Sequence, residues 1–406
     1  MKIRAHVPSI DNDYLVDNRV YTDQNTFDLE MEKIFSTVWN FVCHESEIPN
    51  VGDYITTVVA GQSIIVCRNQ NGEVSAFFNT CLHRGAEVVR DRKGNTRDFI
   101  CFYHQWCYGL DGKLLGIPGK DAYKTTYNKD GLDSLVKGLV AIPVSSLHRL
   151  VFVRFDDEGP TLGEFLGEAA EIIKRPFGDP NFKMWVERDQ TVAANWKMQA
   201  ENSRDGYHAP LLHKRLRHVS PPRPYKNLAN GHTVQYLALD YDSGIENHTV
   251  DDEISSNPEL ANAFLSHPLP GVTREDPSYV VTLFPDTLLL VRYSTVLIER
   301  QEPIQPGQTV IQFRGGGLTT DTDEVKMIRH KHWYYYWDDK KGNLPEDIEA
   351  YESQQRAMRN RAVPYSLIAR GEPGHTGLRG DDNRLRWFWH NWRKLIGAKS
   401  NAPMTT

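Results

Sequence analysis

Two short pairs of a cysteine and a histidine most constrain what this chain of 406 residues can fold into. Cys81 and His83 stand in "NTCLHRGA", and Cys101 and His104 stand in "CFYHQWCYGL". Cysteine and histidine bind zinc and iron–sulfur clusters, and each pair is short enough for one loop to present both ligands. Because two such loops can surround one metal unit, the sequence predicts a metal-binding domain built around these four side chains.

The spacing of these four residues is compatible with two kinds of metal site, a zinc ion or a [2Fe–2S] cluster. A zinc site with two cysteines and two histidines usually has two to four residues between paired ligands, so Cys81-x-His83 is too tight, and no DNA-binding helix follows. A Rieske [2Fe–2S] cluster accounts for the pattern better, because one iron takes both thiolates and the other takes both imidazoles. Cys107 stands three residues after His104 and is a surplus thiol in this interpretation.

The residues around the pairs predict a small antiparallel β domain across roughly 38–155. Apolar, β-rich runs fill residues 51–80, and an Asn-Gly pair at 71–72 separates two of them. Two more turn signals stand at 92–95 and 110–113. Short strands with regular turns are typical of small β domains.

The rest of the chain, 1–37 with 156–406, predicts a larger α+β domain. Helical patterns occupy 161–175, 195–216, 321–336 and 345–362, while β-rich runs lie between about 231 and 318. The predicted architecture is therefore a small antiparallel-β domain plus a catalytic domain with an antiparallel sheet covered by helices.

Composition excludes several classes of protein. The formal net charge of -6 is mild, and no basic cluster indicates binding to nucleic acid. The chain shows neither a secretory signal nor an apolar run of membrane-spanning length, so we expect a cytoplasmic protein that does not enter the membrane. No nucleotide-binding glycine motif follows a strand, and the cluster of three glycines at 315–317 lacks the dinucleotide spacing.

A second group of metal-binding side chains lies in "ENSRDGYHAPLLH". His208 and His213 stand close together on a helix-like segment, and Asp205 precedes His208 by three residues. Two histidines and one carboxylate form the facial triad of non-haem Fe(II) oxygenases, which leaves positions open for O2 and substrate. On spacing alone, Asp205 is a candidate for the carboxylate.

These motifs together resemble the Rieske non-haem iron aromatic-ring-hydroxylating oxygenases, specifically their large (alpha) subunit. The resemblance rests on "NTCLHRGA", "CFYHQWCYGLDGKL" and the pattern E-N-x-x-D-x-Y-H-x4-H. It extends from about residue 38 to residue 397. It implies that Cys81, His83, Cys101 and His104 hold the [2Fe–2S] cluster, and that His208 and His213 bind a mononuclear Fe(II).

The resemblance also changes the role expected for Asp205. The matching aspartate of the family bridges an iron-binding histidine and a Rieske histidine of the neighbouring subunit, which would pair Asp205 with His208 and with His104 of another copy. The third iron ligand then comes from downstream, where the candidates are Asp338, Asp339, Asp347, Asp381 and Asp382. We choose Asp347, because "PEDIEAYESQQ" resembles the family's late ligand segment. The alternative is that Glu346 and Asp347 only favour the start of a helix.

The function implied is the catalytic alpha subunit of an aromatic-ring-hydroxylating dioxygenase. Electrons from NAD(P)H would arrive through a separate reductase, with or without a ferredoxin, and O2 would be added to an aromatic ring. The family implies a trimer of alpha subunits, either alone or as α3β3 with a beta subunit. A monooxygenase or demethylase acting on a non-aromatic or alkoxy substrate shares these ligands, whereas an electron carrier or a zinc-stabilised binding protein would lack the mononuclear iron.

The substrate class is indicated by two details. The E-N-x-x-D spacing and the C-terminal "RWFWHNWRKLIG" look most like terephthalate-, anthranilate- and salicylate-type members, which implies an aromatic carboxylic acid. An arginine fork matches a carboxylate. Arg300, at the end of an apolar strand, and Arg386, before an aromatic run, are the candidates.

Overall fold

The computed structural model divides the chain into two compact units. It describes residues 12–123, 137–213, 225–236, 266–273, 279–338, 340, 342–360, 362–371 and 380–397. The smaller unit is Phe35–Leu162, and the larger unit combines Met1–Ile34 with Gly163–Thr406. Among the described residues, no helix is both long and apolar enough to cross a membrane.

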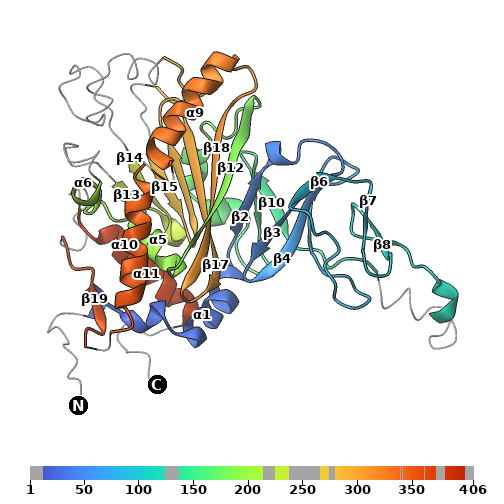
Figure 1. The fold of residues 1–406 in the computed structure, drawn as a ribbon, viewed down its shortest axis with the longest axis horizontal. Coiled ribbons are helices and arrows are strands. Elements are labelled where there is room, and N and C mark those ends of the chain that lie inside the picture. Colours follow the sequence, from blue (N-terminus) through green and yellow to red (C-terminus); the bar gives the residue numbers. More distant parts are fainter. Residues whose placement is uncertain are drawn as a thin grey trace. The chain divides into compact units, whose positions relative to one another are not determined.

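The smaller unit is made of antiparallel sheets (Figure 1). Its three sheets have the strand orders β10-β11-β2, β5-β4-β3-β6 and β7-β8-β9. The strands are β2 Asn40–His44, β3 Asp53–Val59, β4 Gln62–Arg68, β5 Val74–Phe78, β6 Lys93–Asn95, β7 Asp98–Ile100, β8 Cys107–Gly109, β9 Leu114–Gly116, β10 Val144–Leu147 and β11 Leu150–Val153. The predicted antiparallel β domain is confirmed.

The turn signals in this unit had mixed outcomes. Gly72 and Gly112 adopt positive φ angles of 78° and 81°, which the turns predicted at 71–72 and 110–113 require. The turn predicted at 92–95 is wrong, because β6 occupies 93–95 and pairs with β3. Gly94 lies there because a Cβ would stand 2.6 Å from the Tyr54 hydroxyl; its glycine marks a close contact within a sheet.

The larger unit is built on one antiparallel seven-stranded sheet with the order β12-β18-β17-β16-β15-β14-β13. Its strands are β12 Phe182–Val192, β13 Tyr225–Asn227, β14 Thr233–Tyr236, β15 Tyr279–Leu283, β16 Thr287–Val291, β17 Val296–Gln305 and β18 Gln308–Leu318. A separate two-stranded pair joins β1 Leu15–Asp17 to β19 Tyr365–Leu367. Helices accompany the sheet, so the predicted α+β fold class is confirmed.

The helices of this unit are α1 Gln24–Glu30, α4 Ala169–Ile173, α5 Trp196–Asn202, α6 Ala209–Leu212, α9 Asp323–Trp337, α10 Leu344–Ala357 and α11 Asn383–Ile396, with α3 Leu162–Leu166 at its border. The four predicted helical regions all contain helix, although 161–175 and 195–216 are each split in two. Helices α1 and α11 lie in segments for which the sequence predicted no helix.

Close packing against α9 and β12 explains the three glycines at 315–317. They lie in β18, where a Cβ on Gly315 would stand 2.9 Å from the Trp333 ring of α9, and a Cβ on Gly316 would overlap the ring of Phe182. Helices α9 and α10 run along one face of the sheet (Figure 1). The glycines therefore allow aromatic rings to approach the sheet, and their role is in packing.

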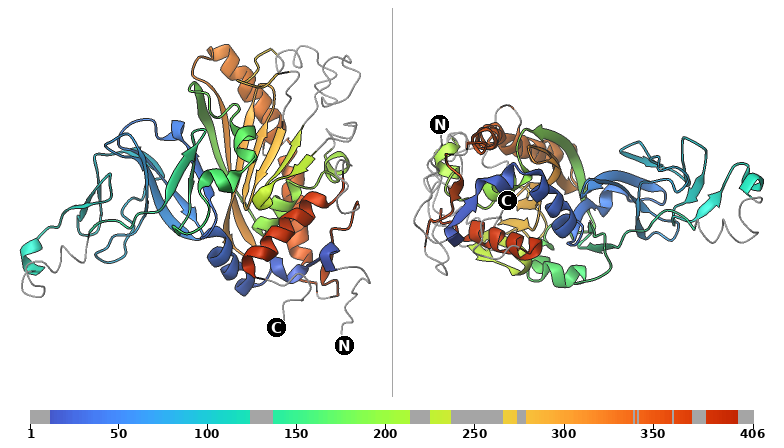
Figure 2. Two further views of the ribbon diagram at one scale, coloured as in Figure 1. Left: turned by 180° about the vertical axis from the view of Figure 1, so that it is seen from behind. Right: turned by 90° about the horizontal axis from the view of Figure 1, so that it is seen from below.

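Segments from opposite ends of the chain meet at Glu30. Figure 2 shows α1 and α11 side by side when the ribbon is seen from below. The Glu30 carboxylate forms an ion pair of 2.6 Å with Lys197 of α5, and both side chains are fully buried. The indoles of Trp196 and Trp392 also donate to it, at 2.9 and 2.8 Å. The buried Glu30 carboxylate therefore has one ammonium and two indole donors, and these contacts hold α1, α5 and α11 together.

Candidate metal centres

The four side chains predicted to hold a cluster come from two loops of the smaller unit with the same backbone design. In each loop, the cysteine N–H donates to the carbonyl five residues later, and the residue four positions later donates back to the cysteine carbonyl. That residue is Gly85 in one loop and Gln105 in the other, with φ angles of 73° and 59°. The repeated left-handed residue turns each loop back on itself, so each loop presents one cysteine and one histidine from the same backbone conformation.

The two loops bring their histidines together at the surface and their cysteines together inside. His83 Nδ1 lies 3.0 Å from His104 Nδ1. Cys81 and Cys101 are only 3% and 1% exposed and belong to one apolar core. Burial is the main reason that the pKa of the Cys101 thiol is raised, and the adjacent Cys81 raises it further. The sulfur atoms and the imidazole nitrogens thus form two ends of one site.

This separation distinguishes between the two metals considered for the site. Ligands of a single metal ion lie close together. Among the residues that the structure describes, these four side chains do not bring three or more ligand atoms within 4.8 Å of one another. Four ligands of one zinc ion would meet that condition, since each would lie about 2.0–2.3 Å from the metal. Ligands of a two-iron cluster divide into two ends instead, so the residues fit a [2Fe–2S] cluster.

Aromatic side chains enclose the site. The Trp106 ring stacks on His83 with centroids 4.9 Å apart and planes 9° apart. The Tyr108 hydroxyl lies 3.1 Å from Cys81 Sγ and accepts the Leu82 N–H at 3.2 Å. Cys107 lies in β8, opposite Ile100, outside the four-residue group.

The second group, in the larger unit, is compact enough for one ion. His208, His213 and Asp347 offer ligand atoms that all lie within 4.8 Å of one another. Asp347 Oδ1 stands 3.6 Å from His208 Nε2 and 3.4 Å from His213 Nε2. Burial raises the pKa of Asp347, and the two imidazoles oppose that shift. Two imidazoles and one buried carboxylate are the donor set of a non-haem Fe(II) site, and a cation would compensate the carboxylate charge.

Local structure explains how the three meet. His208 precedes α6 and His213 follows it, so one helical turn, with Pro210 as its second residue, separates them. Asp347 lies in the first turn of α10. Asn202, at the end of α5, donates to Asp347 Oδ1 at 3.1 Å and lies 3.3 Å from His208 Nε2. Three separate helical segments therefore contribute to one site.

Each histidine of this group has a carboxylate at its other ring nitrogen. Asp205 Oδ2 lies 3.3 Å from His208 Nδ1, and Glu346 Oε2 lies 3.0 Å from His213 Nδ1. Carboxylates in these positions fix the ring orientation and the tautomer of a ligating histidine. Burial alone would raise the pKa of Asp205, but its hydrogen bond with His208 lowers the pKa below the ordinary value. Sequence reasoning placed Asp205 here, whereas it treated Glu346 only as an acidic residue of a helix start.

The other acidic candidates for the third ligand lie in different surroundings. Asp338 caps the end of α9. Asp381 accepts the Tyr225 hydroxyl, and Asp382 accepts the Arg370 N–H at 2.8 Å. Asp339 lies outside the described residues. Of the described candidates, Asp347 alone joins the two histidines.

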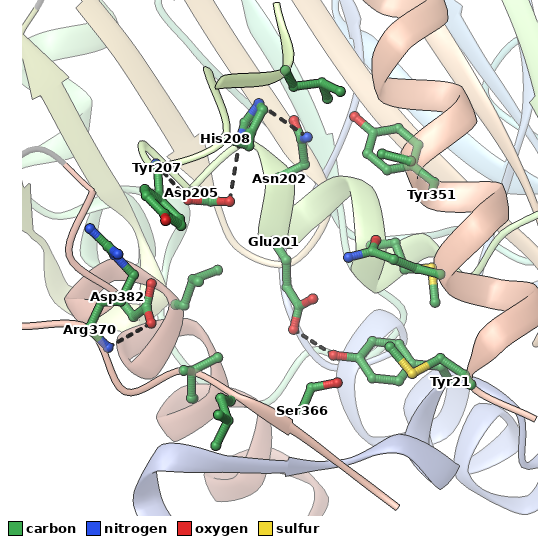
Figure 3. A pocket seen from close by; sticks show the side chains of 18 of the residues that line it. Tyr21, Glu201, Asn202, Asp205, Tyr207, His208, Tyr351, Ser366, Arg370 and Asp382 are labelled. Carbon is green, nitrogen blue, oxygen red and sulfur yellow. Dashed lines mark hydrogen bonds and ion pairs between the residues drawn. The ribbon is translucent and has the colours of Figure 1, made fainter. Parts of the chain in front are cut away.

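A pocket of about 490 Å³ adjoins this group. Figure 3 shows His208, Asp205 and Tyr207 along one side of it and Glu201 and Tyr21 deeper within. Its walls come from α5, α10, β19 and the start of α11. No pattern in the sequence indicated this pocket, because its lining residues are scattered along the chain.

The two arginines predicted to bind a substrate carboxylate do not line this pocket. Arg300 is 1% exposed and lies 3.4 Å from Asp286. It follows Glu299 in β17, and successive side chains of a strand point to opposite faces. Glu299 accepts Gln199 of α5, so its side chain lies on the face that carries the metal group and Arg300 lies on the other. Arg386 donates to the backbone carbonyls of residues 368, 370 and 371. These contacts favour structural roles, and the substrate role stays a prediction.

Comparison with known proteins covers both units. Residues 38–131 match the family model of the Rieske [2Fe-2S] domain, and residues 178–382 match that of the ring hydroxylating alpha subunit (catalytic domain). The alpha subunit of 2-aminobenzenesulfonate 2,3-dioxygenase from Alcaligenes sp is 33% identical over 96% of this chain and 95% of its own. The large subunit of anthranilate 1,2-dioxygenase from Burkholderia cepacia is 29% identical over 97% and 96%. The fold is also similar to naphthalene 1,2-dioxygenase from Rhodococcus sp. bound to indole, with a TM-score of 0.76, 23% identity and 96% of each chain covered.

Proposed function

The chain belongs to the Rieske ring-hydroxylating oxygenase alpha subunits. On that premise we propose which residues form each domain and which bind each metal centre. Residues 38–155 carry the electron-storing domain, and 1–37 with 156–406 form the catalytic domain. Cys81, His83, Cys101 and His104 hold the [2Fe–2S] cluster, while His208, His213 and Asp347 hold the mononuclear iron. The observation that carries the proposal is the convergence of those last three side chains within 4.8 Å.

The protein's own residues orient these centres. The cluster supplies one-electron storage, and the mononuclear iron supplies a site at which O2 can be activated. Asp205 and Glu346 hold the Nδ1 sides of His208 and His213, so that both Nε2 atoms face Asp347. Asn202 lies against both Asp347 and His208 and limits how far either can move. One face of the group remains for substrate and O2.

Asp205 has a further role in the proposal. Its side chain is 28% exposed, and it lines the pocket beside the exposed Tyr207. His104 of another copy of the chain would approach it there and pass an electron through Asp205 to His208. The assembly is then at least an alpha trimer, either alone or with a beta subunit as α3β3, and a reductase with or without a ferredoxin supplies the electrons.

The substrate in this proposal is an aromatic ring that bears an acid group. The two relatives named above act, by their names, on an aminobenzenesulfonate and on anthranilate, and both molecules are ring acids. An arginine fork would match such a group. Arg300 and Arg386 remain the candidates made from the sequence.

One experiment tests the two centres and another tests the substrate. The isolated protein should contain three irons per chain and show the EPR signal of a reduced Rieske cluster; two irons per chain would contradict the mononuclear site. Oxygen uptake should then be screened with a surrogate reductase on benzoate, salicylate, anthranilate, aminobenzenesulfonate, phthalate isomers and neutral arenes. Products formed under labelled O2 distinguish two added oxygen atoms from one, and uptake with neutral arenes alone would contradict the acid substrate.

A further inference from the structure

Two carboxyl groups inside the larger unit have opposite surroundings. Glu30 is paired with the Lys197 ammonium, as described above. Glu201 receives neutral donors instead: the Tyr21 hydroxyl at 2.7 Å and the Trp389 indole N–H at 2.6 Å, both at Oε1. Within the described part of the chain, Glu201 is in no ion pair. A buried carboxyl held by neutral donors can lose or take up a proton without breaking a salt bridge.

Glu201 is also the carboxyl that the pocket connects to the metal group. The pocket is lined by Glu201, Asp205 and His208 together, and Figure 3 shows the Glu201 side chain reaching down from α5 to Tyr21. Protein surrounds Glu201 on all sides, yet its side chain remains accessible through the pocket. The pocket volume of about 490 Å³ is room for several water molecules, and Glu201, Asp205 and His208 supply polar groups in its lining. Leu367 in the pocket lining is 61% exposed, so the pocket reaches solvent.

The charge environment of Glu201 favours proton exchange near neutrality. Burial raises its pKa to about 7, although the bonds from Tyr21 and Trp389 and the charge of Lys197 each lower it. Asp205 raises the pKa further. The titratable and charged groups near Glu201 or along its pocket are Tyr21, Glu30, Lys197, Arg204, Asp205, Tyr207, His208, Tyr351, Arg370 and Asp382. A carboxyl with a pKa of about 7 can exchange a proton near neutral pH.

We propose that Glu201 is a proton-relay residue, which takes up a proton from solvent at the pocket rim and passes it through pocket water toward Asp205 and His208. This rests on the proposed oxygenase function, in which an aromatic ring, O2, two electrons and two protons give a cis-dihydrodiol. The reductase supplies both electrons, and each proton ends on one oxygen of the product. The metal group is enclosed by α5, α6 and α10, so those protons need a route through the protein.

The alternative carriers fit less well. Glu299 is 4% exposed, is held by Gln199, and does not line the pocket. Glu346 is engaged with His213 on the far side of that ring. Of these three carboxyl groups, Glu201 is the one that combines neutral donors, a place in the pocket lining and a position beside Asp205.

The main test replaces the acid with its amide. Glu201→Gln keeps an oxygen that can accept from Tyr21 and Trp389 but cannot carry a proton. We expect kcat for product formation to fall about 10- to 100-fold, with the iron content, the Rieske EPR signal and the rate of cluster reduction by the reductase unchanged. The exposed Glu349 of α10 provides the matched control, and Glu349→Gln should leave kcat unchanged.

A pH profile separates a relay from a structural role. The acid form of Glu201 is present below its raised pKa and is lost as the pH rises through about 7, so the wild-type kcat should fall over that range. Glu201→Gln should be slow and flat across it. Tyr21→Phe removes a bond that lowers the pKa, so the falling limb should move to higher pH while the fold is retained.

Infrared titration supplies a readout that does not depend on turnover. A protonated carboxyl band should titrate near neutral pH in the wild type, move to higher pH in Tyr21→Phe, and be absent in Glu201→Gln. Wild-type kcat and an unchanged pH limb in Glu201→Gln would overturn the relay. If that variant fails to fold, an unmoved limb in Tyr21→Phe would overturn it equally. Loss of iron or of cluster reduction in the wild-type enzyme would instead point to failure of the underlying oxygenase function.

Discussion

The two metal groups of this chain are built in contrasting ways. In the smaller unit, two loops of the same design each supply one cysteine and one histidine, and each loop closes with its own backbone hydrogen bonds. In the larger unit, His208 and His213 flank one turn of helix, but Asp347 comes from a helix that starts well over a hundred residues later. The first group is therefore fixed largely by local geometry, while the second depends on tertiary packing of α5, α6 and α10.

The strongest test of whether the two metal groups form independently is to remove one ligand from each group. Asp347→Ala should lower the iron content from three to two per chain and reduce product formation to background, with the Rieske EPR signal intact. His104→Ala should remove that signal while the mononuclear iron remains. These two variants test whether the groups assemble independently, and loss of both centres from either variant would contradict it.

Asp205→Ala should have the next largest effect. Both centres should stay loaded, because Asp205 contacts a ligand without being one, but turnover should fall by about 100-fold or more as electron transfer to the mononuclear site slows. Rapid-mixing measurements on the reduced enzyme should show a cluster that is reoxidised slowly by O2 and substrate. Normal reoxidation would remove Asp205 from the electron route.

Glu346→Gln tests the carboxylate that sequence reasoning overlooked. Glu346 holds the Nδ1 side of His213 at 3.0 Å, so its loss should weaken iron affinity about 10- to 100-fold. Competition with a chelator, followed by iron analysis, measures this directly. The exposed Glu349 of the same helix is the control, and equal iron loss from both variants would assign the effect to helix charge alone.

The smallest expected effect is in the smaller unit. Tyr108→Phe removes a hydroxyl 3.1 Å from Cys81 Sγ, and hydrogen bonds to cluster sulfurs raise the reduction potential. One bond of about 0.5–1.5 kcal/mol corresponds to roughly 20–60 mV for a one-electron couple. The potential should fall by that amount with the cluster intact, and an unchanged potential in protein-film voltammetry would show that Tyr108 has only a packing role.

The same contrast explains what the sequence could predict. Cysteine and histidine spacing indicated the cluster directly, because all of its ligands lie in two short stretches. For the third iron ligand, the residues alone left five downstream acids open, since acidic residues are common at helix starts; resemblance to the family chose Asp347. Neither spacing nor resemblance indicated Glu201 as a carboxyl held by neutral donors, because those donors are distant in the sequence: Tyr21 precedes α1, and Trp389 belongs to α11.

The helix α11 was missed although its sequence contained a signal. Its buried apolar residues Leu385, Phe388, Trp389 and Trp392 follow a helical spacing. Arginines and asparagines among them obscured the pattern. The prediction of turns at 92–95 failed for a different reason, because a glycine required by a neighbouring ring looks the same in sequence as one required by a turn.

The junction at Glu30 has a consequence for how this protein forms on the ribosome. The smaller unit is one continuous stretch, Phe35–Leu162, and can fold as soon as it has emerged. Helix α1 emerges before it, but the Trp392 indole that donates to Glu30 lies 362 residues further along the chain. Lys197 and Trp196 of α5 can reach the Glu30 carboxylate earlier, but its last donor is present only when α11 has been made, so the N-terminal segment completes its contacts late.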